Sequence, residues 1–563
     1  MRHRSPATRA LATAKAASNF AHRTGCGIDE ATSVVAACGG HRVARQPASR
    51  AGGEGMTRRG FLGGGLAVSA GVVLPRWLTH PTPRAARSDQ RIVIIGSGIA
   101  GLGCAYRLWR EHGIASEIYE YNADRAGGRI YTLRGYFDEG QYVEEHAEFI
   151  STEHTETRAL ARSFGLRLDD IGRYPPGTHP DEYQFRFGGK FWTQAALNRD
   201  WHEWAYELFA TAAFRKAPWP TVFDRATEWA KRWDAMSGTD WIATNIPGGL
   251  ESDFGRLCVA ILLDEFGGPV EEQSALNLVY LLGQYDSVPS DRQPKGSPQL
   301  SGTDEKWHIR GGNDQLISGV MERLPAGTVR LGQELVAIRS RGNRRWTCTF
   351  AADGHMHDVV ADQVVLALPF TKLRDVALVG VELPAPQLQA ITSEPLGSNS
   401  KIQMQFSSRV WNAAHWTANL YTDEIVQGGW ETTIDQPGPH GILIALPGGQ
   451  GGADIGRRYD LPSYYGPAPA AMVHDYLGCF EQFWPGVRAA YSGKAYYAWS
   501  SGDPHILGAY SYLKVGQYTA FNGIQGRQHG TLHFAGEHTS LNFQGFIEGG
   551  LRSGYRCARE IMA

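Results

Sequence analysis

Residues 91–101 read R-I-V-I-I-G-S-G-I-A-G, and this stretch decides the fold. The apolar run at 92–95 has the length of one buried parallel strand and is too short for a helix. Gly96, Gly98 and Gly101 follow on the G-x-G-x-x-G spacing, and a helical pattern comes next. Gly96 permits a tight turn, Gly98 lets the backbone approach a pyrophosphate, and Gly101 allows close helix–strand packing. The phosphates are expected at the N-terminus of the helix, where free N–H groups favour negative charge.

A second predicted strand covers residues 117–119 and is followed by Glu120. An acid at this distance from the glycines is typical of a side chain that binds ribose hydroxyls. The strand, the helix and the acid together favour a dinucleotide site over a purely structural glycine turn. Residues 125–129, R-A-G-G-R, resemble the R-x-G-G-R element of FAD-dependent amine oxidases. The resemblance implies FAD rather than NAD, bound in part by Arg125, Gly127, Gly128 and Arg129.

Composition places the chain among ordinary soluble globular proteins. It has 563 residues, of which 42% are hydrophobic and 20% charged. A formal charge of −2 gives no electrostatic reason to expect nucleic acid as a partner. The seven cysteines form no C-x-x-C pair, so neither a disulfide framework nor a metal site is predicted.

The N-terminal part of the chain predicts export. Residues 1–55 are rich in Ala, Arg and Ser and are interpreted as a disordered or mis-started extension. Residues 56–90 begin M-T-R-R-G-F-L and continue with a short apolar run, which indicates a twin-arginine signal and a linker. The protein is therefore expected in the periplasm, the cell envelope or outside the cell. Membrane contact is expected only through an uncleaved signal.

Residues 143–150, V-E-E-H-A-E-F-I, resemble the segment that passes beside the flavin ring in amine oxidases. His146 stands where that family commonly has a glycine. Glu148 occupies a variable position that often touches the substrate. A solvent-exposed carboxylate is the alternative interpretation of Glu148.

Residues 394–402, E-P-L-G-S-N-S-K-I, resemble the family segment whose lysine holds a water at the flavin N5 atom. Lys401 also begins an alternating apolar strand, where a lysine is costly unless it is satisfied or functional. An edge-strand lysine that reaches solvent is the structural alternative. The motif favours a catalytic role.

The C-terminal region carries a further match, F-A-G-E at 534–537 and F-Q-G-F-I-E-G-G at 543–550. It resembles the last flavin-binding strand and helix of the family. Residues 499–510 resemble the W…G-x-Y segment that faces the ring. The resemblance implies cofactor contacts at Val336, Trp499, Gly536, Glu537 and Ile547, and a substrate wall at Tyr510 and Phe546.

Residues 90–563 thus resemble the flavin-containing amine oxidase family over nearly their whole length. The resemblance implies an α/β fold with a Rossmann-like FAD-binding domain assembled from three stretches, 91–170, 305–375 and 495–563. A mixed α+β substrate-binding domain is then inserted twice, at 171–304 and 376–494.

Two departures from the family refine the expected chemistry. Monoamine oxidases attach FAD through a cysteine where this chain has Ala509, so FAD is predicted to be bound without a covalent bond. L-amino acid oxidases often carry a carboxylate-binding arginine where this chain has Glu148. Glu148 would instead attract a distal ammonium, which favours an arylalkyl amine or a diamine.

The predicted enzyme oxidises a primary amine to an imine by hydride transfer to flavin N5, and O₂ reoxidises the flavin to give hydrogen peroxide. The predicted catalytic residues are Glu148, Lys401, Tyr510 and Phe546. An L-amino acid oxidase of the same fold, with Arg134 as the carboxylate ligand, is one alternative. A flavin dehydrogenase or desaturase with another electron acceptor is a second alternative, and a homodimer is compatible with the sequence.

Overall fold

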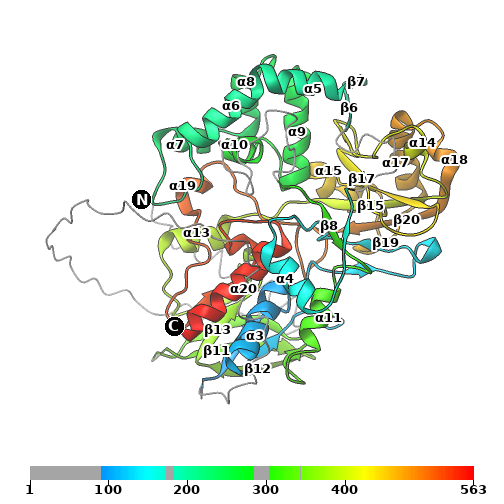
Figure 1. Ribbon diagram of the computed structural model, residues 1–563. Helices are drawn as coiled ribbons and strands as arrows, with labels where there is room; N and C mark the ends of the chain where they lie inside the picture. The colour runs from blue at the N-terminus through cyan, green and yellow to red at the C-terminus, as the bar shows by residue number, and fades with distance from the viewer. Residues whose placement is uncertain (1–89, 173–182, 284–302, 343) are drawn as a thin grey trace, which may run out of the picture. The chain divides into compact units, whose positions relative to one another are not determined.

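The computed structural model describes residues 90–172, 183–283, 303–342 and 344–563 (Figure 1). The predicted N-terminal extension and all but the last residue of the predicted signal and linker lie outside the described residues. Within the described part, no helix is long and apolar enough to cross a membrane. Residues 90–563 belong to one compact unit, and their predicted division into two domains stays a prediction.

A five-stranded sheet contains the glycine-rich stretch. Its order is β21-β13-β1-β2-β9, and every pairing in it is parallel. The strands are β1 (Ile92–Ile95), β2 (Glu117–Tyr119), β9 (Val329–Arg330), β13 (Gln363–Leu366) and β21 (Leu532–Phe534). All residues of β1, β13 and β21 are buried, as expected for a parallel sheet covered on both faces.

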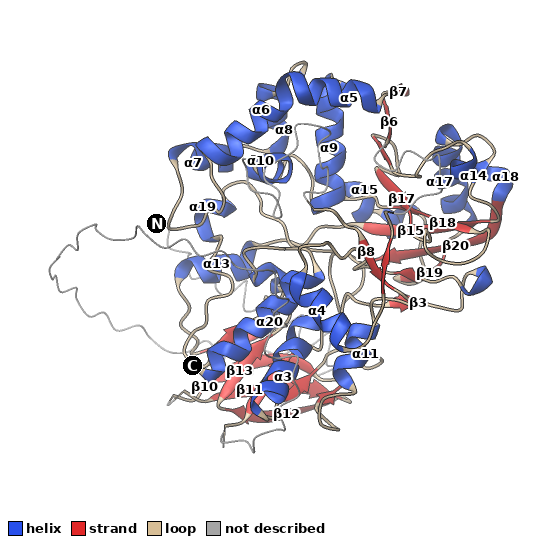
Figure 2. Cartoon of the chain, viewed as in Figure 1, coloured by secondary structure: helices blue, strands red, loops and turns tan. Residues whose placement is uncertain are grey.

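Four helices pack together beside this sheet: α3 (Ile99–His112), α4 (Thr155–Ser163), α11 (Gln315–Met321) and α20 (Ile547–Met562). Helices α3 and α20 lie side by side although they come from opposite ends of the described chain (Figures 1 and 2). Their approach requires glycine, because a Cβ on Gly554 would lie 2.1 Å from the carbonyl oxygen of Ala100.

A second sheet, of order β12-β11-β10-β14, is antiparallel except for the parallel pair β10–β14. It contains β10 (Glu334–Ser340), β11 (Trp346–Ala352), β12 (His355–Ala361) and β14 (Ala377–Val379). Three short helices follow: α12 (Phe370–Leu373), α13 (Ala385–Ser393) and α19 (Gln517–Phe521). Helix α13 contacts both α12 and α19.

The largest sheet has eight strands of mixed orientation in the order β19-β20-β15-β18-β17-β16-β6-β7. Its strands are β6 (Gln184–Phe187), β7 (Lys190–Trp192), β15 (Ser400–Phe406), β16 (Leu420–Thr422), β17 (Gly428–Glu431), β18 (Gly441–Ala445), β19 (Tyr465–Pro467) and β20 (Tyr491–Trp499). Every residue of β15 is buried, including Lys401. The edge-strand alternative for Lys401 is therefore wrong.

Two groups of helices accompany this sheet. The first comprises α5 (Gln194–Asp200), α6 (Tyr206–Ala210), α7 (Glu228–Asp234), α8 (Gly238–Asn245), α9 (Asp253–Phe266) and α10 (Ala275–Gly283). The second comprises α14 (Val410–Ala413), α15 (Gly449–Ala453), α16 (Ile455–Arg458), α17 (Ala470–Phe483) and α18 (Val487–Ala490). Aromatic residues of the first group, such as Trp233 in α7 and Trp241 in α8, lie in the hydrophobic core.

Two short antiparallel pairs complete the described strands. They are β3 (Thr132–Leu133) with β4 (Val143–Glu144), and β5 (Leu168–Asp170) with β8 (Trp307–Ile309). Strand β4 leads directly into the predicted ring-facing segment, so its placement positions Glu148.

Candidate active site

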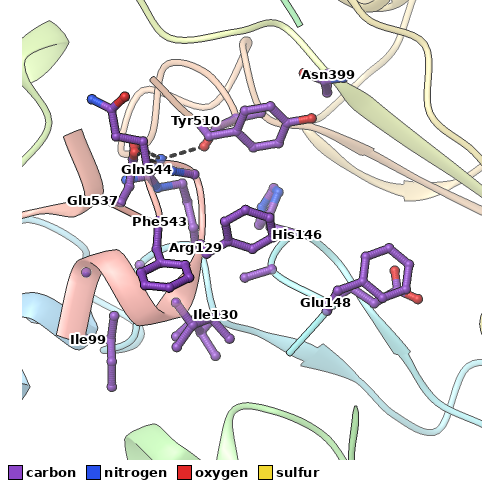
Figure 3. A pocket seen from close by; sticks show the side chains of 18 of the residues that line it. Ile99, Arg129, Ile130, His146, Glu148, Asn399, Tyr510, Glu537, Phe543 and Gln544 are labelled. Carbon is purple, nitrogen blue, oxygen red and sulfur yellow. Dashed lines mark hydrogen bonds and ion pairs between the residues drawn. The ribbon is translucent and has the colours of Figure 1, made fainter. Parts of the chain in front are cut away.

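A cavity of about 1060 Å³ runs from the carboxyl ends of the parallel strands to the eight-stranded sheet (Figure 3). A crevice at the carboxyl ends of parallel strands is where open α/β sheets bind their ligands. Thirteen of the residues predicted for the site line this cavity: Gly96, Gly98, Glu120, Gly127, Gly128, Arg129, Glu148, Lys401, Tyr510, Gly536, Glu537, Phe546 and Ile547.

The three glycines that follow β1 have different structural roles. Gly96 has φ of 99°, which an L side chain rarely adopts. A Cβ on Gly101 would lie 2.1 Å from the carbonyl oxygen of Gly96, so Gly101 sits outside the cavity and allows helix α3 to approach the strand. A Cβ on Gly98 would meet nothing within 4 Å, which leaves an open cradle for a ligand at the start of α3.

Hydrogen bonds of Glu120 and Arg125 fix the turns at the side of the cavity where the glycine-rich stretch lies. Glu120 Oε2 accepts hydrogen bonds from the Ser97 amide at 2.8 Å and from Ser97 Oγ at 2.7 Å. Arg125 lies outside the cavity, and its Nη1 donates to the carbonyl oxygen of Gly128 at 2.9 Å. Arg125 therefore shapes the R-A-G-G-R turn instead of lining the site.

Two further predicted cofactor residues, Val336 and Trp499, lie outside the cavity wall. At β10 the neighbouring Leu335 lines the cavity and Val336 does not, and the strand register shifts between Leu335 and Ala337. Trp499 ends β20 and packs closely against Gly456 and Gly502 instead. The cofactor contacts predicted for Val336 and Trp499 stay predictions.

An ion pair links the early and late parts of the chain beside the cavity. Arg129 Nη1 donates to Glu537 Oε1 at 3.0 Å and to the carbonyl oxygen of Ala509 at 2.5 Å. Glu537 also accepts from Ser511 Oγ at 2.7 Å and from the Gly545 amide at 2.8 Å. Burial alone would raise the pKa of Glu537, but Arg129 and these hydrogen bonds hold it below its ordinary value.

Lys401 and Glu148 form a buried ion pair in the cavity wall. Lys401 Nζ lies 2.5 Å from Glu148 Oε2 and also donates to the carbonyl oxygen of Glu144 at 3.4 Å. Glu148 Oε1 accepts from Thr432 Oγ1 at 2.6 Å and from Trp430 Nε1 at 3.0 Å. The exposed alternative for Glu148 is wrong, because only 4% of the residue is exposed. Its charge is already matched by Lys401.

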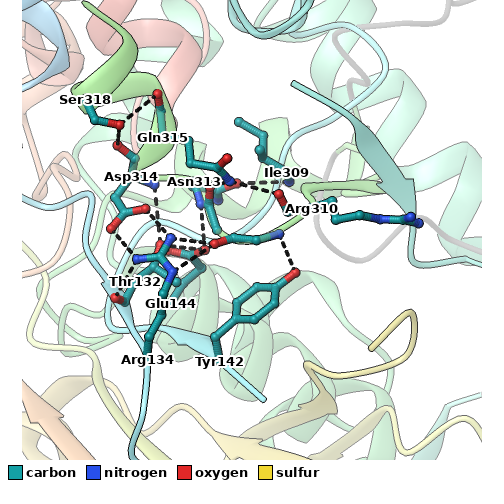
Figure 4. Close-up of polar contacts among 12 residues, drawn as sticks. Thr132, Arg134, Tyr142, Glu144, Ile309, Arg310, Asn313, Asp314, Gln315 and Ser318 are labelled. Atoms are coloured by element: carbon teal, nitrogen blue, oxygen red, sulfur yellow. Dashed lines mark hydrogen bonds and ion pairs between the residues drawn. The ribbon is translucent and has the colours of Figure 1, made fainter. Parts of the chain in front are cut away.

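A polar network outside the cavity fixes the segment that carries Glu148 (Figure 4). The Glu144 carboxylate accepts from Thr132 Oγ1 at 2.9 Å and from the Asn313 amide at 2.8 Å. Burial, opposed by these hydrogen bonds, raises the pKa of Glu144 to about 8. Arg134 belongs to the same network, where Nη1 donates to Asp314 Oδ2 at 2.8 Å. Arg134 does not line the cavity.

Comparison with protein families matches residues 99–562 to the flavin containing amine oxidoreductases. The chain belongs to this family. Amine oxidase [flavin-containing] A of Canis lupus familiaris is 23% identical over 497 residues, which cover 84% of each protein. The flavin-dependent L-tryptophan oxidase of Lentzea aerocolonigenes is 25% identical over 509 residues, covering 85% of this chain and 99% of that protein.

Solved structures show the same fold. Cyclohexylamine oxidase from Brevibacterium oxydans superposes with a TM-score of 0.67 at 20% identity, covering 84% of this chain and 99% of that one. Putrescine oxidase bound to putrescine gives the same TM-score and coverage at 19% identity. The α/β architecture of this amine oxidoreductase is thus that of FAD-dependent amine oxidases.

The cofactor of this amine oxidoreductase is FAD, and the residues fit it. The open cradle at Gly98, the acid Glu120 and the N-terminus of α20 at Ile547 would hold its diphosphate, its ribose and its ring. Ala509 lines the cavity, and no cysteine does so among the described residues. The amine oxidoreductase therefore binds FAD without a thioether bond.

Several residues in the wall of this amine oxidoreductase were missed from the sequence. Trp430 lines the cavity and follows no motif, and it donates to Glu148 only because the eight-stranded sheet places β17 beside that residue. Thr432, just after β17 and outside the wall, donates to the same carboxylate. Asp264 and Glu265 also line the cavity, at the end of helix α9. Their one sequence cue is that two adjacent acids close an apolar helical pattern.

Proposed function

We propose that the protein is an FAD-dependent oxidase of primary amines. The balanced reaction is R-CH₂-NH₂ + O₂ + H₂O → R-CHO + NH₃ + H₂O₂. Membership of the flavin containing amine oxidoreductases supports the reaction class. Bound FAD supplies the two-electron oxidation and passes the electrons to O₂.

The choice of an amine over an α-amino acid rests on the charges that line the cavity. A buried carboxylate needs a charge-assisted partner, most often an arginine. In the described part of the chain, Arg129 is the one arginine in the wall, and its guanidinium is already paired with the Glu537 carboxylate. Arg134, the alternative carboxylate ligand, is bound to Asp314 outside the wall.

Aromatic side chains prepare the amine for oxidation. An alkylamine with a pKa of roughly 10.4 is neutral in only about one molecule in a thousand at pH 7.5, a handicap of about 4 kcal/mol. Tyr510, Phe546 and Trp430 line the cavity, and apolar surroundings disfavour the ammonium form. The neutral nitrogen keeps the lone pair that the developing iminium requires.

Lys401 is positioned to hold a proton donor at the reacting end. Of its three N–H donors, one meets Glu148 and one meets the carbonyl oxygen of Glu144. The third has no partner among the described residues and is free to bind a water. The Glu148 pair keeps this water site electrically neutral, so it does not repel a cationic substrate.

Comparison of an amine with its matching amino acid tests the proposal. We expect kcat/KM for tryptamine to exceed that for tryptophan, with hydrogen peroxide as the measured product. If tryptophan is favoured more than tenfold, about 1.4 kcal/mol of transition-state preference, the L-amino acid oxidase is the correct function. Substrate oxidation with an artificial acceptor but without peroxide would identify a dehydrogenase.

We also propose that the twin-arginine segment exports the folded, FAD-loaded protein. The basis is the T-R-R-G-F-L sequence at 57–62 followed by a short apolar run. Replacing both Arg58 and Arg59 with lysine should retain the FAD-loaded protein in the cytoplasm, as measured by cell fractionation. Unchanged export of this variant would refute the signal.

A further inference from the structure

Helix α9 ends in the wall of the cavity and places two adjacent acids there. Asp264 is only 8% exposed, and Glu265 is half-buried beside it. Asp264 Oδ2 accepts from the Tyr421 hydroxyl at 3.3 Å, while Oδ1 has no hydrogen-bond partner. Glu265 makes no hydrogen bond or ion pair with any described residue. An unpaired buried acceptor in the wall of a ligand cavity, here Asp264 Oδ1, indicates that the ligand supplies the missing donor.

No lysine or arginine of the described cavity wall forms a hydrogen bond or ion pair with either acid, and the Lys401 charge only partly opposes the effect of burial on the pKa of Asp264. The lysines and arginines of the described cavity wall each bind elsewhere: Arg129 to Glu537, Lys306 to Asp170, Lys372 to the carbonyl oxygen of Pro504, and Lys401 to Glu148. The acids also stand in the last turn of α9, where the helix dipole is negative. Burial raises the pKa of Asp264 to about 7 and raises that of Glu265 well above its ordinary range.

Tyr510 connects this acidic end to the predicted substrate wall. Its hydroxyl donates to the carbonyl oxygen of Asp264 at 2.5 Å. A substrate that lies along Tyr510 therefore has one end near the aromatic wall and the other end near Asp264. Its second end then lies near the carboxyl groups of Asp264 and Glu265.

We propose that Asp264 and Glu265 bind a second cationic group of the substrate, so that the enzyme prefers diamines, or amines with a distal ammonium, over monoamines. This inference rests on the proposed amine oxidase function. The sequence suggested that Glu148 attracts a distal ammonium, but Lys401 already forms an ion pair with Glu148. Asp264 and Glu265 take this role instead.

A matched pair of substrates tests the inference. 1,6-Diaminohexane and hexylamine have the same chain and differ only in the second ammonium. We expect kcat/KM of the holoenzyme to be at least tenfold higher for the diamine. The D264N/E265Q variant should lower kcat/KM for the diamine at least tenfold more than it lowers kcat/KM for hexylamine. The loss should fall mainly on KM, because a remote contact is made equally in the ground state and the transition state.

Asp253→Asn provides the control, because Asp253 begins the same helix and is exposed outside the cavity. It should keep the full diamine preference. If the double variant does not bind FAD, Glu265→Gln alone should still lower the preference several-fold. Equal rates for the two substrates, or a preference that survives the substitutions, would overturn the inference. Oxidation of neither substrate would instead overturn the proposed function.

Discussion

The two ends of the cavity differ in whether their charged side chains are paired. At the cofactor end, Arg129 and Glu537 neutralise each other, and the open space is bordered by glycines. At the substrate end, Lys401 and Glu148 form a similar pair, but Asp264 and Glu265 form no ion pair with a lysine or arginine of the described cavity wall. A site that supplies both charges itself can be built before its ligand arrives. A site that supplies only one charge selects the ligand that carries the other.

The largest expected effect comes from the glycines of the cofactor end. Gly101→Ala places a Cβ 2.1 Å from a carbonyl oxygen of the preceding turn, so the variant should lose both bound FAD and folded protein. Gly98→Ala meets no protein atom within 4 Å, so it should fold but bind FAD at least tenfold more weakly. Flavin absorbance and circular dichroism measure the two properties. A Gly98→Ala variant with normal FAD affinity would show that the cradle does not face the diphosphate.

Lys401 comes next. Lys401→Met should slow turnover at least tenfold, a barrier increase of about 1.4 kcal/mol, while FAD stays bound. It should also destabilise the protein by roughly 3–5 kcal/mol, because Glu148 is left buried without its cation. The double variant with Glu148→Gln separates these effects: stability should return and the rate should not. Recovery of the rate would mean that Lys401 acts only as a counterion.

The roles of residues that depend on flanking parts of the sequence could be predicted. The roles of Gly96, Gly98 and Gly101 follow from a strand and a helix that flank them directly. Contacts across long separations could not be predicted. The partner of Glu148 lies 253 residues away, and Asp264 meets Tyr421 at a separation of 157. The register irregularity between Leu335 and Ala337 in β10 is likewise not visible in the sequence pattern.

A smaller effect should appear in the pH dependence of the diamine preference. The Asp264 carboxyl is faced by Tyr421, Lys401 and Glu265, and its pKa is raised to about 7 by burial. It is protonated below that pH and ionises above it, so attraction for a cation grows as pH rises. The ratio of kcat/KM for 1,6-diaminohexane to that for hexylamine should therefore increase between pH 6 and pH 8. This ratio cancels deprotonation of the reacting amine, and kcat/KM reports groups of the free enzyme.

Asp264→Asn should flatten this profile, although Glu265 leaves part of the preference. A ratio that falls with pH would contradict the assignment of a carboxylate to the distal group.

The smallest effect is expected at Arg134. Because Arg134 is bound to Asp314 outside the cavity, Arg134→Gln should change the ratio of tryptamine to tryptophan activity less than twofold. The same variant is expected to lose some stability through the network around Glu144. A strong change in selectivity would restore the amino-acid alternative.

The way the parallel sheet is assembled has a consequence for synthesis on the ribosome. Arg91 beside β1 is bonded to Asp362 across 271 residues, and Arg129 reaches Glu537 across 408. A nascent chain therefore lacks the last wall of its cofactor site until almost the whole polypeptide has emerged. Strands β1 and β2 can pair with each other early, but β1 lacks its partner β13, and β13 lacks β21, until those later strands emerge. The open sheet edge is meanwhile exposed to chaperones and to aggregation. Flavin supply should accordingly limit the yield of soluble enzyme after translation ends, not while it proceeds.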